Sequence, residues 1–125
     1  MDYTSKAQNV LDIAVKWAKR LKQNYIGTEH ILLGLVEEET GVAARVLAEN
    51  GVKQEQLLEM IEELISTNNH LKVAERDGYT PRAKEVLEES GRQAKRFGCA
   101  QIGTEHILMA ILKETECAAP RLLNT

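Results

Sequence analysis

The chain has 125 residues, of which 43% are hydrophobic and 28% charged, as expected of one ordinary globular domain. Its net charge of −3, with no basic block and few aromatic residues, argues against a nucleic-acid partner. No apolar run approaches the roughly 20 residues of a membrane span, and the first residues lack a secretory signal. We therefore expect a cytoplasmic location and no membrane partner.

A duplication organises the chain. Residues 26–32 recur unchanged as residues 102–108, and a shift of 76 positions aligns residues 3–49 with residues 79–125 at 19 identities in 47 pairs. A repeat of this kind decides the architecture before any single helix does. We divide the chain into repeat one at residues 3–66, a linker at residues 67–78 and repeat two at residues 79–125.

Apolar residues spaced three and four apart predict four helices in repeat one. Thr4 and Thr28 are suited to be the N-caps of the first two, and Asn50-Gly51 is typical of a helix C-terminus. The predicted helices cover residues 5–22, 29–39, 41–50 and 54–66. The first has the longest apolar stripe, which comprises Ala7, Val10, Leu11, Ala14, Trp17, Ala18 and Leu21.

The polar linker ends in Asp77-Gly78, and repeat two then begins at Thr80-Pro81, where proline suits the first helical position. Predicted helices cover residues 81–97 and 105–112. A seventh helix would include Arg121 and Leu122 and start late or be distorted, because Pro120 clashes with a preceding turn.

No strand pattern is recognisable, so the predicted fold is all-α, with two pseudo-symmetric four-helix repeats packed into a single domain. The sequence stops where repeat one would still have its fourth helix. We therefore expect repeat two to lack its last helix and to leave some apolar surface without its usual cover.

The Glu29-His30 and Glu105-His106 pairs are the first candidates for chemistry. In a structural interpretation, Thr28 and Thr104 cap their helices, the glutamates complement the helix dipole, and the histidines pack or cap. For the glutamates this interpretation is weaker, because the capping box places glutamate three residues after the cap, not next to it.

Metal and catalytic interpretations have less support. Neither repeat contains His-x-x-x-His or Glu-x-x-His, and no serine, cysteine or lysine recurs beside the Glu-His pair as a nucleophile. Cys99 and Cys117 align with Gln23 and Gly41, which argues against a role that the repeats share. The chain has no Walker motif. We expect no enzyme activity, no metal and no cofactor in this domain.

A binding site is the remaining interpretation. The helix starts at Thr4 and Thr80 offer a hydroxyl and backbone amides to an anion, and Glu29 and Glu105 offer carboxylates to a guanidinium group. We expect the start of the first helix to lie beside Glu29, and the start of the fifth beside Glu105.

The motifs Ile-Gly-Thr-Glu-His-Ile-Leu-Leu-Gly-Leu and Gly-Val-Ala-Ala-Arg-Val-Leu in repeat one, and Tyr-Thr-Pro-Arg-Ala-Lys-Glu-Val-Leu in repeat two, resemble the Clp N-terminal domain, in particular that of ClpC-type AAA+ unfoldases. The resemblance covers the whole chain. It implies an eight-helix, non-catalytic domain that receives substrates and adaptors such as MecA for the ClpP peptidase. ATP and Mg²⁺ would belong to the parent protein.

The resemblance also implies two equivalent phosphoarginine sites. By motif match these fall on Thr4, Glu29, Thr80 and Glu105, with Tyr3, His30, Tyr79 and His106 as possible supporting residues. The chain departs from the family pattern at residues 108–111 and 116–120, which puts an adaptor footprint there in doubt. The alternative is a docking module for adaptors or unfolded segments that does not bind phosphoarginine.

Overall fold

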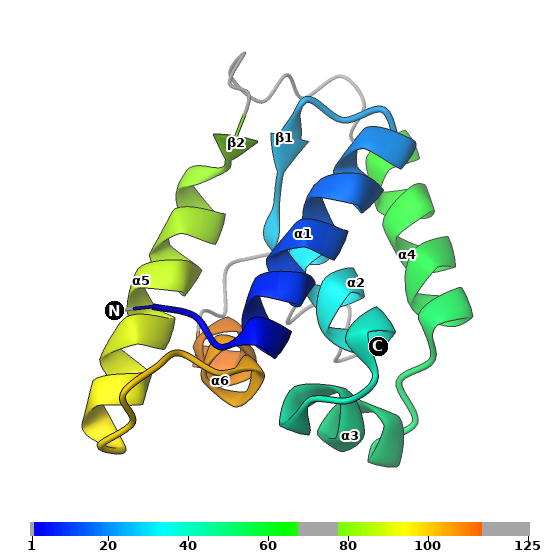
Figure 1. Ribbon diagram of the computed structural model, residues 1–125. Helices are drawn as coiled ribbons and strands as arrows, with labels where there is room; N and C mark the ends of the chain where they lie inside the picture. The colour runs from blue at the N-terminus through cyan, green and yellow to red at the C-terminus, as the bar shows by residue number, and fades with distance from the viewer. Residues whose placement is uncertain (1, 68–77, 114–125) are drawn as a thin grey trace.

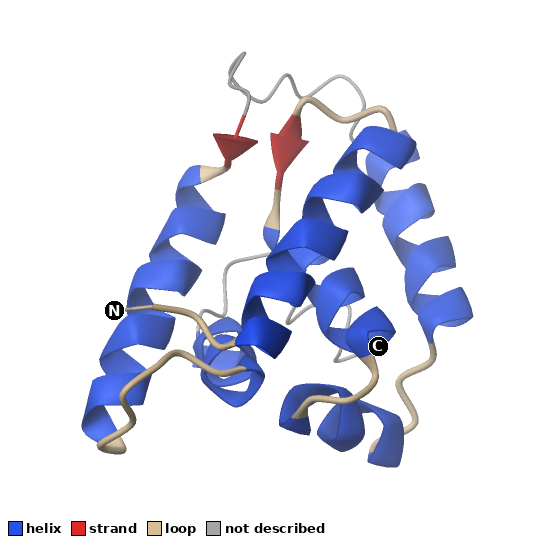
Figure 2. Ribbon diagram, in the orientation of Figure 1, coloured by secondary structure: helices blue, strands red, loops and turns tan. Residues whose placement is uncertain are grey.

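The computed structural model describes residues 2–67 and 78–113. These residues are mostly helical, with two very short strands (Figures 1 and 2). The helices are α1 (Ser5–Arg20), α2 (Thr28–Glu38), α3 (Val42–Glu49), α4 (Gln54–Thr67), α5 (Pro81–Arg96) and α6 (Thr104–Lys113), and the strands are β1 (Tyr25–Ile26) and β2 (Gly78–Tyr79). The predicted all-α class is confirmed. The predicted seventh helix, with Pro120, Arg121 and Leu122, lies outside the described residues.

Helix α1 forms because its cap and its apolar spacing agree. The Thr4 Oγ accepts a hydrogen bond from the Ala7 N–H at 3.1 Å, which satisfies one amide that the helix itself cannot. Lys19 and Arg20 complement the dipole in the last turn. The predicted stripe from Ala7 to Ala18 is buried, while Leu21 is the half-buried C-cap residue.

Helix α2 is the centre of the core and contacts every other helix of the described part. Figure 1 shows it between α1 and α4. Because neighbours surround it, it is apolar around its circumference, and Ile31, Leu32 and Leu33 are fully buried. Gly34 lets α1 approach closely, since a Cβ at that position would overlap the Val10 carbonyl.

Helices α5 and α6 repeat the α1–α2 pair. Thr80 is the N-cap of α5, its Oγ accepts from the Ala83 N–H at 3.1 Å, and Pro81 occupies the first helical turn as predicted. Val86 and Ile107 from this pair join the same buried cluster as α1 and α2. The two repeats therefore share one core.

The expectation of no strand was wrong. Strands β1 and β2 pair in parallel, with Tyr25 opposite Gly78 and Ile26 opposite Tyr79, and an isolated bridge joins Tyr3 to Ile102. Two residues are too few to show an alternating pattern. Each pairing joins one repeat to the other, so it arises from their packing and not from local sequence.

Candidate functional site

Helices α2 and α6 begin with the same structure, and it differs from the predicted one. The N-cap of α2 is Gly27, and Thr28 and Thr104 are already helical, so these threonines are not the caps. Instead the His30 Nδ1 accepts a hydrogen bond from the Gly27 N–H at 2.9 Å, and the His106 Nδ1 accepts from the Gly103 N–H at 2.9 Å. The prediction that the histidines cap or pack is confirmed.

This hydrogen bond fixes the protonation of His30. Because Nδ1 is the acceptor, the ring is neutral and its proton lies on Nε2. Burial lowers the pKa of His30 to about 4, which keeps the ring neutral at physiological pH. The buried Nε2 has no hydrogen-bond partner in the described part of the chain. His30 is therefore neutral near pH 7 and caps the start of α2.

Both glutamates fold back over the glycine at the start of their own helix. A Cβ on Gly27 would overlap the Glu29 carboxylate, and a Cβ on Gly103 would overlap that of Glu105. Only glycine leaves room for this conformation. The repeated Gly-Thr-Glu-His motif thus fixes a carboxylate and an imidazole at each helix start.

The two carboxylates differ in exposure. Glu29 is only 8% exposed, whereas Glu105 is half-buried. Burial raises the pKa of the Glu29 carboxyl above its ordinary value, although a hydrogen bond from its own backbone N–H opposes this. Glu29 has no cationic partner among the described residues. Its negative charge in turn helps burial to raise the pKa of Tyr25 to about 12.

The structure pairs helix starts and glutamates across the repeats, which corrects the predicted arrangement. The Thr4 N–H donates to the Ile102 carbonyl at 2.9 Å, and the Thr80 N–H donates to the Ile26 carbonyl at 3.0 Å. The start of α1 therefore lies beside the Glu105 segment, and the start of α5 lies beside the Glu29 segment. Sequence alone could not distinguish these pairings, because the two segments are identical in both repeats.

Thr4 and Glu105 line one cavity of about 460 Å³. Lys6 of α1, the Thr40–Arg45 segment and His106 also line it. Thr4 is the N-cap of α1, and the first N–H groups of a helix have no carbonyl within that helix to bond. This cavity therefore places the start of α1 beside the Glu105 carboxylate, where we expected Glu29 from the sequence.

The β1–β2 pair connects the start of α5 at Thr80 to the segment before Glu29. Tyr25 packs against the His30 ring with centroids 5.6 Å apart. Tyr3 and Tyr79 are half-buried against the core, and burial raises the pKa of both. Neither tyrosine lines the cavity beside Glu105. The expectation that they support a ligand site therefore rests on the resemblance alone.

Sequence reasoning overlooked Lys6 and Arg45, which line the cavity from outside the repeated Gly-Thr-Glu-His motif. One signal was available. Arg45 aligns with Arg121, and Lys6 aligns with Arg82, so both positions are basic in both repeats. A helical pattern treats such residues as solvated surface, and only the packing of α3 against α6 brings Arg45 to the cavity.

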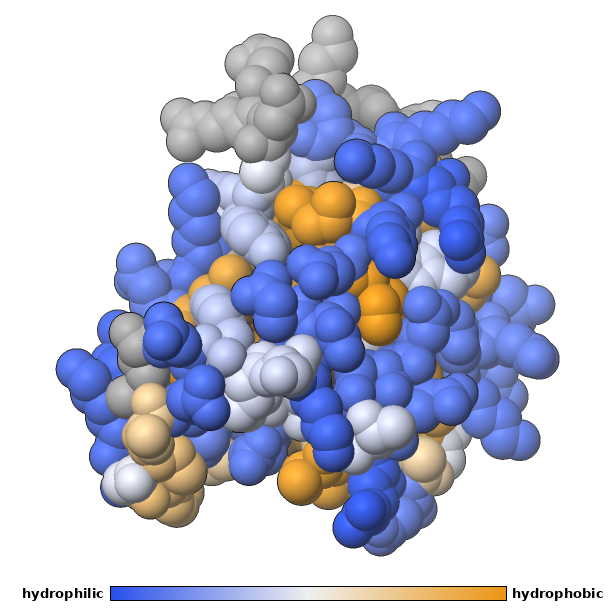
Figure 3. Space-filling view, viewed as in Figure 1, coloured by the Kyte–Doolittle hydropathy of each residue, from blue (hydrophilic) through white to orange (hydrophobic). Residues whose placement is uncertain are grey.

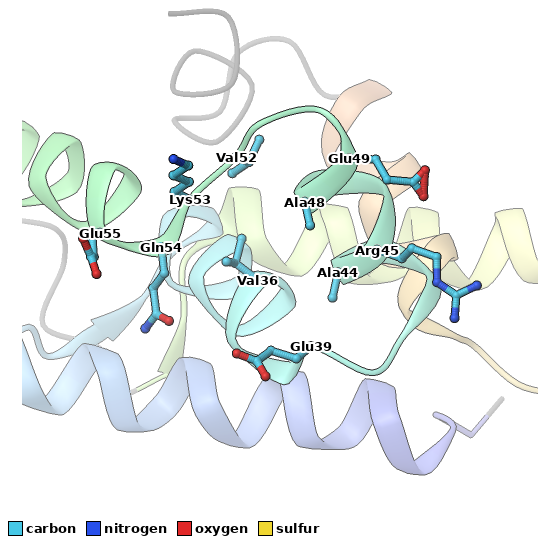
Figure 4. A pocket seen from close by; sticks show the side chains of 10 residues that line it. All are labelled: Val36, Glu39, Ala44, Arg45, Ala48, Glu49, Val52, Lys53, Gln54 and Glu55. Carbon is cyan, nitrogen blue, oxygen red and sulfur yellow. The ribbon is translucent and has the colours of Figure 1, made fainter.

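A second hollow of about 800 Å³ lies between α3 and the start of α4. Figure 4 shows Val36, Ala44 and Val52 around it, with Glu39 and Lys53 at its edges. On the face in Figure 3, hydrophobic residues form separate patches within a mostly hydrophilic surface. In the part of the chain that the structure describes, the exposed large hydrophobic residues are Val42, Val46, Phe97, Met109 and Leu112.

Metal ligands and membrane helices are not found in the described ranges. Residues 2–67 and 78–113 contain no group of three or more His, Cys, Asp or Glu side chains that could hold a metal ion. No helix in them is long and apolar enough to cross a membrane. Cys99 is a free thiol, and Cys117 lies outside the described residues.

The two helical repeats form a duplicated all-α domain, in which the helix start of each repeat donates a hydrogen bond to the other repeat. Residues 2–125 match the family model described as the Clp repeat (R) N-terminal domain. The chain belongs to this family.

Curated relatives agree with this assignment. The chain is 44% identical over 122 residues to "Negative regulator of genetic competence ClpC/MecB" of Bacillus subtilis, which covers 98% of the chain and 15% of that protein. It is 43% identical to "Chaperone protein ClpB" of Oceanobacillus iheyensis, with the same coverage. The chain thus spans a small part of the length of these relatives.

Solved structures show the same fold. The N-terminal domain of the chaperone ClpD from Arabidopsis thaliana superposes with a TM-score of 0.76 at 20% identity, over 98% of this chain and 82% of that one. The N-terminal domain of Hsp104 from Candida albicans gives 0.69 at 14% identity, over 99% and 88%. At these identities the likeness supports the fold and says nothing further about ligands.

Proposed function

We propose that this domain receives substrate and adaptor proteins for a ClpC-type unfoldase and binds phosphoarginine side chains at two sites. One site pairs Thr80 with Glu29, and the other pairs Thr4 with Glu105. Family membership and the ClpC/MecB relative support the receptor role. The geometry of the helix starts supports the choice of ligand.

The site would be selective because one half attracts a positive group and the other half attracts a negative group. A carboxylate can accept two parallel hydrogen bonds from a guanidinium group, whereas a helix start attracts the phosphoryl group. Phosphoserine lacks the cation, and the carboxylate would repel its phosphate. Arginine lacks the anion and leaves the helix start unfilled. Phosphoarginine supplies both groups on one side chain.

The buried carboxylate of Glu29 is the observation that carries this proposal. A charged group that is 8% exposed and has no cation beside it in the described part of the chain costs folding free energy. Unfavourable burial of this kind is typical of functional sites, where a ligand supplies the missing charge. The matching fold of Glu105 over Gly103 suggests that the second site works in the same way.

Isothermal titration calorimetry of the chain with phosphoarginine, arginine and phosphoserine tests the ligand. We expect two sites for phosphoarginine and at least about tenfold weaker binding of the other two compounds, since each loses a charge-assisted contact. Glu29→Gln and Glu105→Gln keep the side-chain shape and should each remove one site, and the double variant should remove both. Equal affinity for phosphoarginine and arginine would overturn the proposal.

The groove between α3 and α4 favours a second candidate, a docking module that uses no phosphorylated side chain. Its apolar floor and the exposed Val42 and Val46 on α3 could accept an adaptor or an unfolded segment. In that case the small ligand would not bind, and Val46→Asp would weaken capture of a denatured model protein while Glu29→Gln plus Glu105→Gln would not.

The remaining assignments concern the parent protein. We propose that adaptors of the MecA type and the ClpP peptidase act with that parent in the cytoplasm, and that the parent, not this domain, uses ATP and Mg²⁺. Incubation of the chain with ATP should give no phosphate release. Turnover by the purified domain would contradict its proposed non-catalytic role.

A further inference from the structure

The cavity beside Glu105 contains more positive charge than a guanidinium receptor needs. Its Lys, Arg, Asp and Glu lining residues are Lys6, Arg45 and Glu105, which give two cations and one anion. A carboxylate alone would suit arginine. The two cations call for a ligand that also carries an anion, and a phosphoryl group brings a charge of about −1.5 to −2 at neutral pH.

Both cations are in position to contact such a group. The Lys6 Nζ donates to the Thr40 carbonyl at 3.1 Å, which fixes the ammonium at the cavity and leaves two of its three donors. The Arg45 side chain is exposed and has no hydrogen-bond or ion-pair partner in the described part of the chain. Arg45 also lines the α3–α4 groove, and Figure 4 shows its side chain on the side of the groove away from Lys53 and Gln54.

Helix α3 is fixed against the second repeat, and this determines where Arg45 stands. The Ala43 N–H donates to the Thr104 Oγ at 3.3 Å. Gly41 packs so closely that a Cβ there would lie 2.6 Å from the same oxygen. The start of α3 is therefore held at the first residue of α6, directly before Glu105, and Arg45 lies one turn further along α3.

We propose that Arg45 and Lys6 bind the phosphoryl group in the Thr4–Glu105 site, so that α3 of repeat one completes this site. This inference rests on the proposed function and adds the residues that recognise the phosphate. Arg45 supplies up to five donors in a planar fork suited to phosphate oxygens, and Lys6 supplies a point charge. Glu105 then receives the guanidinium end of the same ligand.

The two sites allow an internal control. Figure 1 shows α3, the start of α1 and the segment before α6 at one end of the molecule, opposite the β1–β2 pair. In a Glu29→Gln background only the Thr4–Glu105 site remains, and in a Glu105→Gln background only the other remains. Arg45→Ala should weaken phosphoarginine binding in the first background and leave it unchanged in the second.

Calorimetry with phosphoarginine and arginine measures the effect. In the Glu29→Gln background we expect Arg45→Ala to weaken phosphoarginine binding about tenfold and Lys6→Ala about threefold. Arginine should bind no more weakly in either variant. Arg45→Lys should restore part of the loss, and the affinity of Arg45→Ala should depend less on salt concentration. Lys53→Ala is the matched control, because it removes one exposed cation that lines the groove but not the cavity.

The possible failures are distinct. If the unsubstituted chain binds no phosphoarginine, the proposed function fails and this inference fails with it. If both sites bind but Arg45→Ala has no effect in the Glu29→Gln background, only the assignment of Arg45 fails. A third outcome is that Arg45→Ala lowers the affinity for phosphoarginine equally in both backgrounds, or lowers the affinity for arginine by the same factor. Either result would show that Arg45 acts on the fold or on the overall electrostatic field and not on the phosphoryl group.

Discussion

The two repeats have the same helix starts, but different side chains form the hydrogen bonds that join the two helices of each pair. In repeat one, Glu37 of α2 accepts hydrogen bonds from the Trp17 Nε1 at 3.2 Å and the Gln54 Nε2 at 2.7 Å. In repeat two the equivalent position is Lys113, which donates to Glu89 of α5 at 3.0 Å. The charge at this position is reversed, and the packing of the pair is nevertheless maintained.

The comparison shows which residues a duplication can change. The Gly-Thr-Glu-His start, in the conformation seen here, depends on the absence of a Cβ at glycine and on the Nδ1 of histidine. A contact between two helices needs only complementary shape and charge, which many residue pairs provide. Residues 26–32 are accordingly unchanged at residues 102–108, whereas the residue pair that joins the two helices differs between the repeats.

Core substitutions should give the largest difference between the repeats. Leu33 is fully buried, whereas its equivalent Met109 is 37% exposed on α6. We expect Leu33→Ala to lower the free energy of unfolding by about 3 kcal/mol, and Met109→Ala by less than about 1 kcal/mol, because only the first opens a cavity. Urea denaturation followed by circular dichroism measures both. Equal losses would mean that α6 is as enclosed as α2.

The His30 cap should make stability depend on pH. Its pKa of about 4 in the folded chain lies below the ordinary value of 6.5, so the unfolded chain binds the proton more readily. Stability should therefore fall as pH drops from about 6.5 to 4, by about 3 kcal/mol over the whole window.

Denaturation of the chain and of His30→Asn at several pH values tests this expectation, because the variant lacks the titrating ring. The difference in unfolding free energy between the two proteins should shrink toward pH 4. The nearby Glu29 titrates in the opposite sense, so that difference is more informative than either curve alone. A constant difference would show that the ring is not buried in its neutral form.

Substitution of Glu29 should have a smaller effect with the opposite sign. The raised pKa of Glu29 means that the folded chain favours the protonated carboxyl, so its ionisation removes stability as pH rises through that pKa. Glu29→Gln should raise the melting temperature at pH 8 and change it less at pH 4.5. Glu105→Gln is the control, since that carboxylate is more exposed. A lower melting temperature for Glu29→Gln at pH 8 would contradict an unfavourable buried charge.

The Glu89 cluster should give the smallest effect. Hydrogen bonds from Arg92, Gln93 and Lys113 hold the pKa of Glu89 down at about 2, so its contribution is lost as pH falls from about 4.5 toward 2. Because the lysine is exposed, we expect Lys113→Ala to cost less than about 1 kcal/mol at pH 7, and less in high salt. Thermal melts at two salt concentrations measure it, and a loss above about 2 kcal/mol would indicate a buried ion pair.

Much of the fold was predictable because the physical signals were local. Apolar spacing and the Thr-x-x-Ala starts predicted α1 and α5 to within a few residues of their ends, and Gly51 marked the end of α3 as expected. The duplication predicted that the repeats would share one architecture. The short strands were missed, because no two-residue pattern can be read before its partner is known.

The candidate site was predictable in its parts and not in its assembly. The repeated motif indicates Glu29 and Glu105, but it also predicts Thr28 as a cap, because threonine is usually a good one. The actual cap uses the histidine at the third helical position, where the familiar capping box has glutamate or glutamine. Which helix start faces which glutamate depends on long-range packing. Because residues 26–32 and 102–108 are identical, the sequence does not distinguish the two possible pairings.

The crossed arrangement has a consequence for any molecule with a single copy of this repeat. Such a molecule would carry a helix start and a glutamate segment that do not meet, since Thr4 meets the Ile102 segment and Thr80 meets the Ile26 segment. It could form this pairing by associating with a second copy about a twofold axis, and two equal pairings would then form together. Fusion of two copies into one chain makes that association intramolecular and leaves each pairing free to diverge.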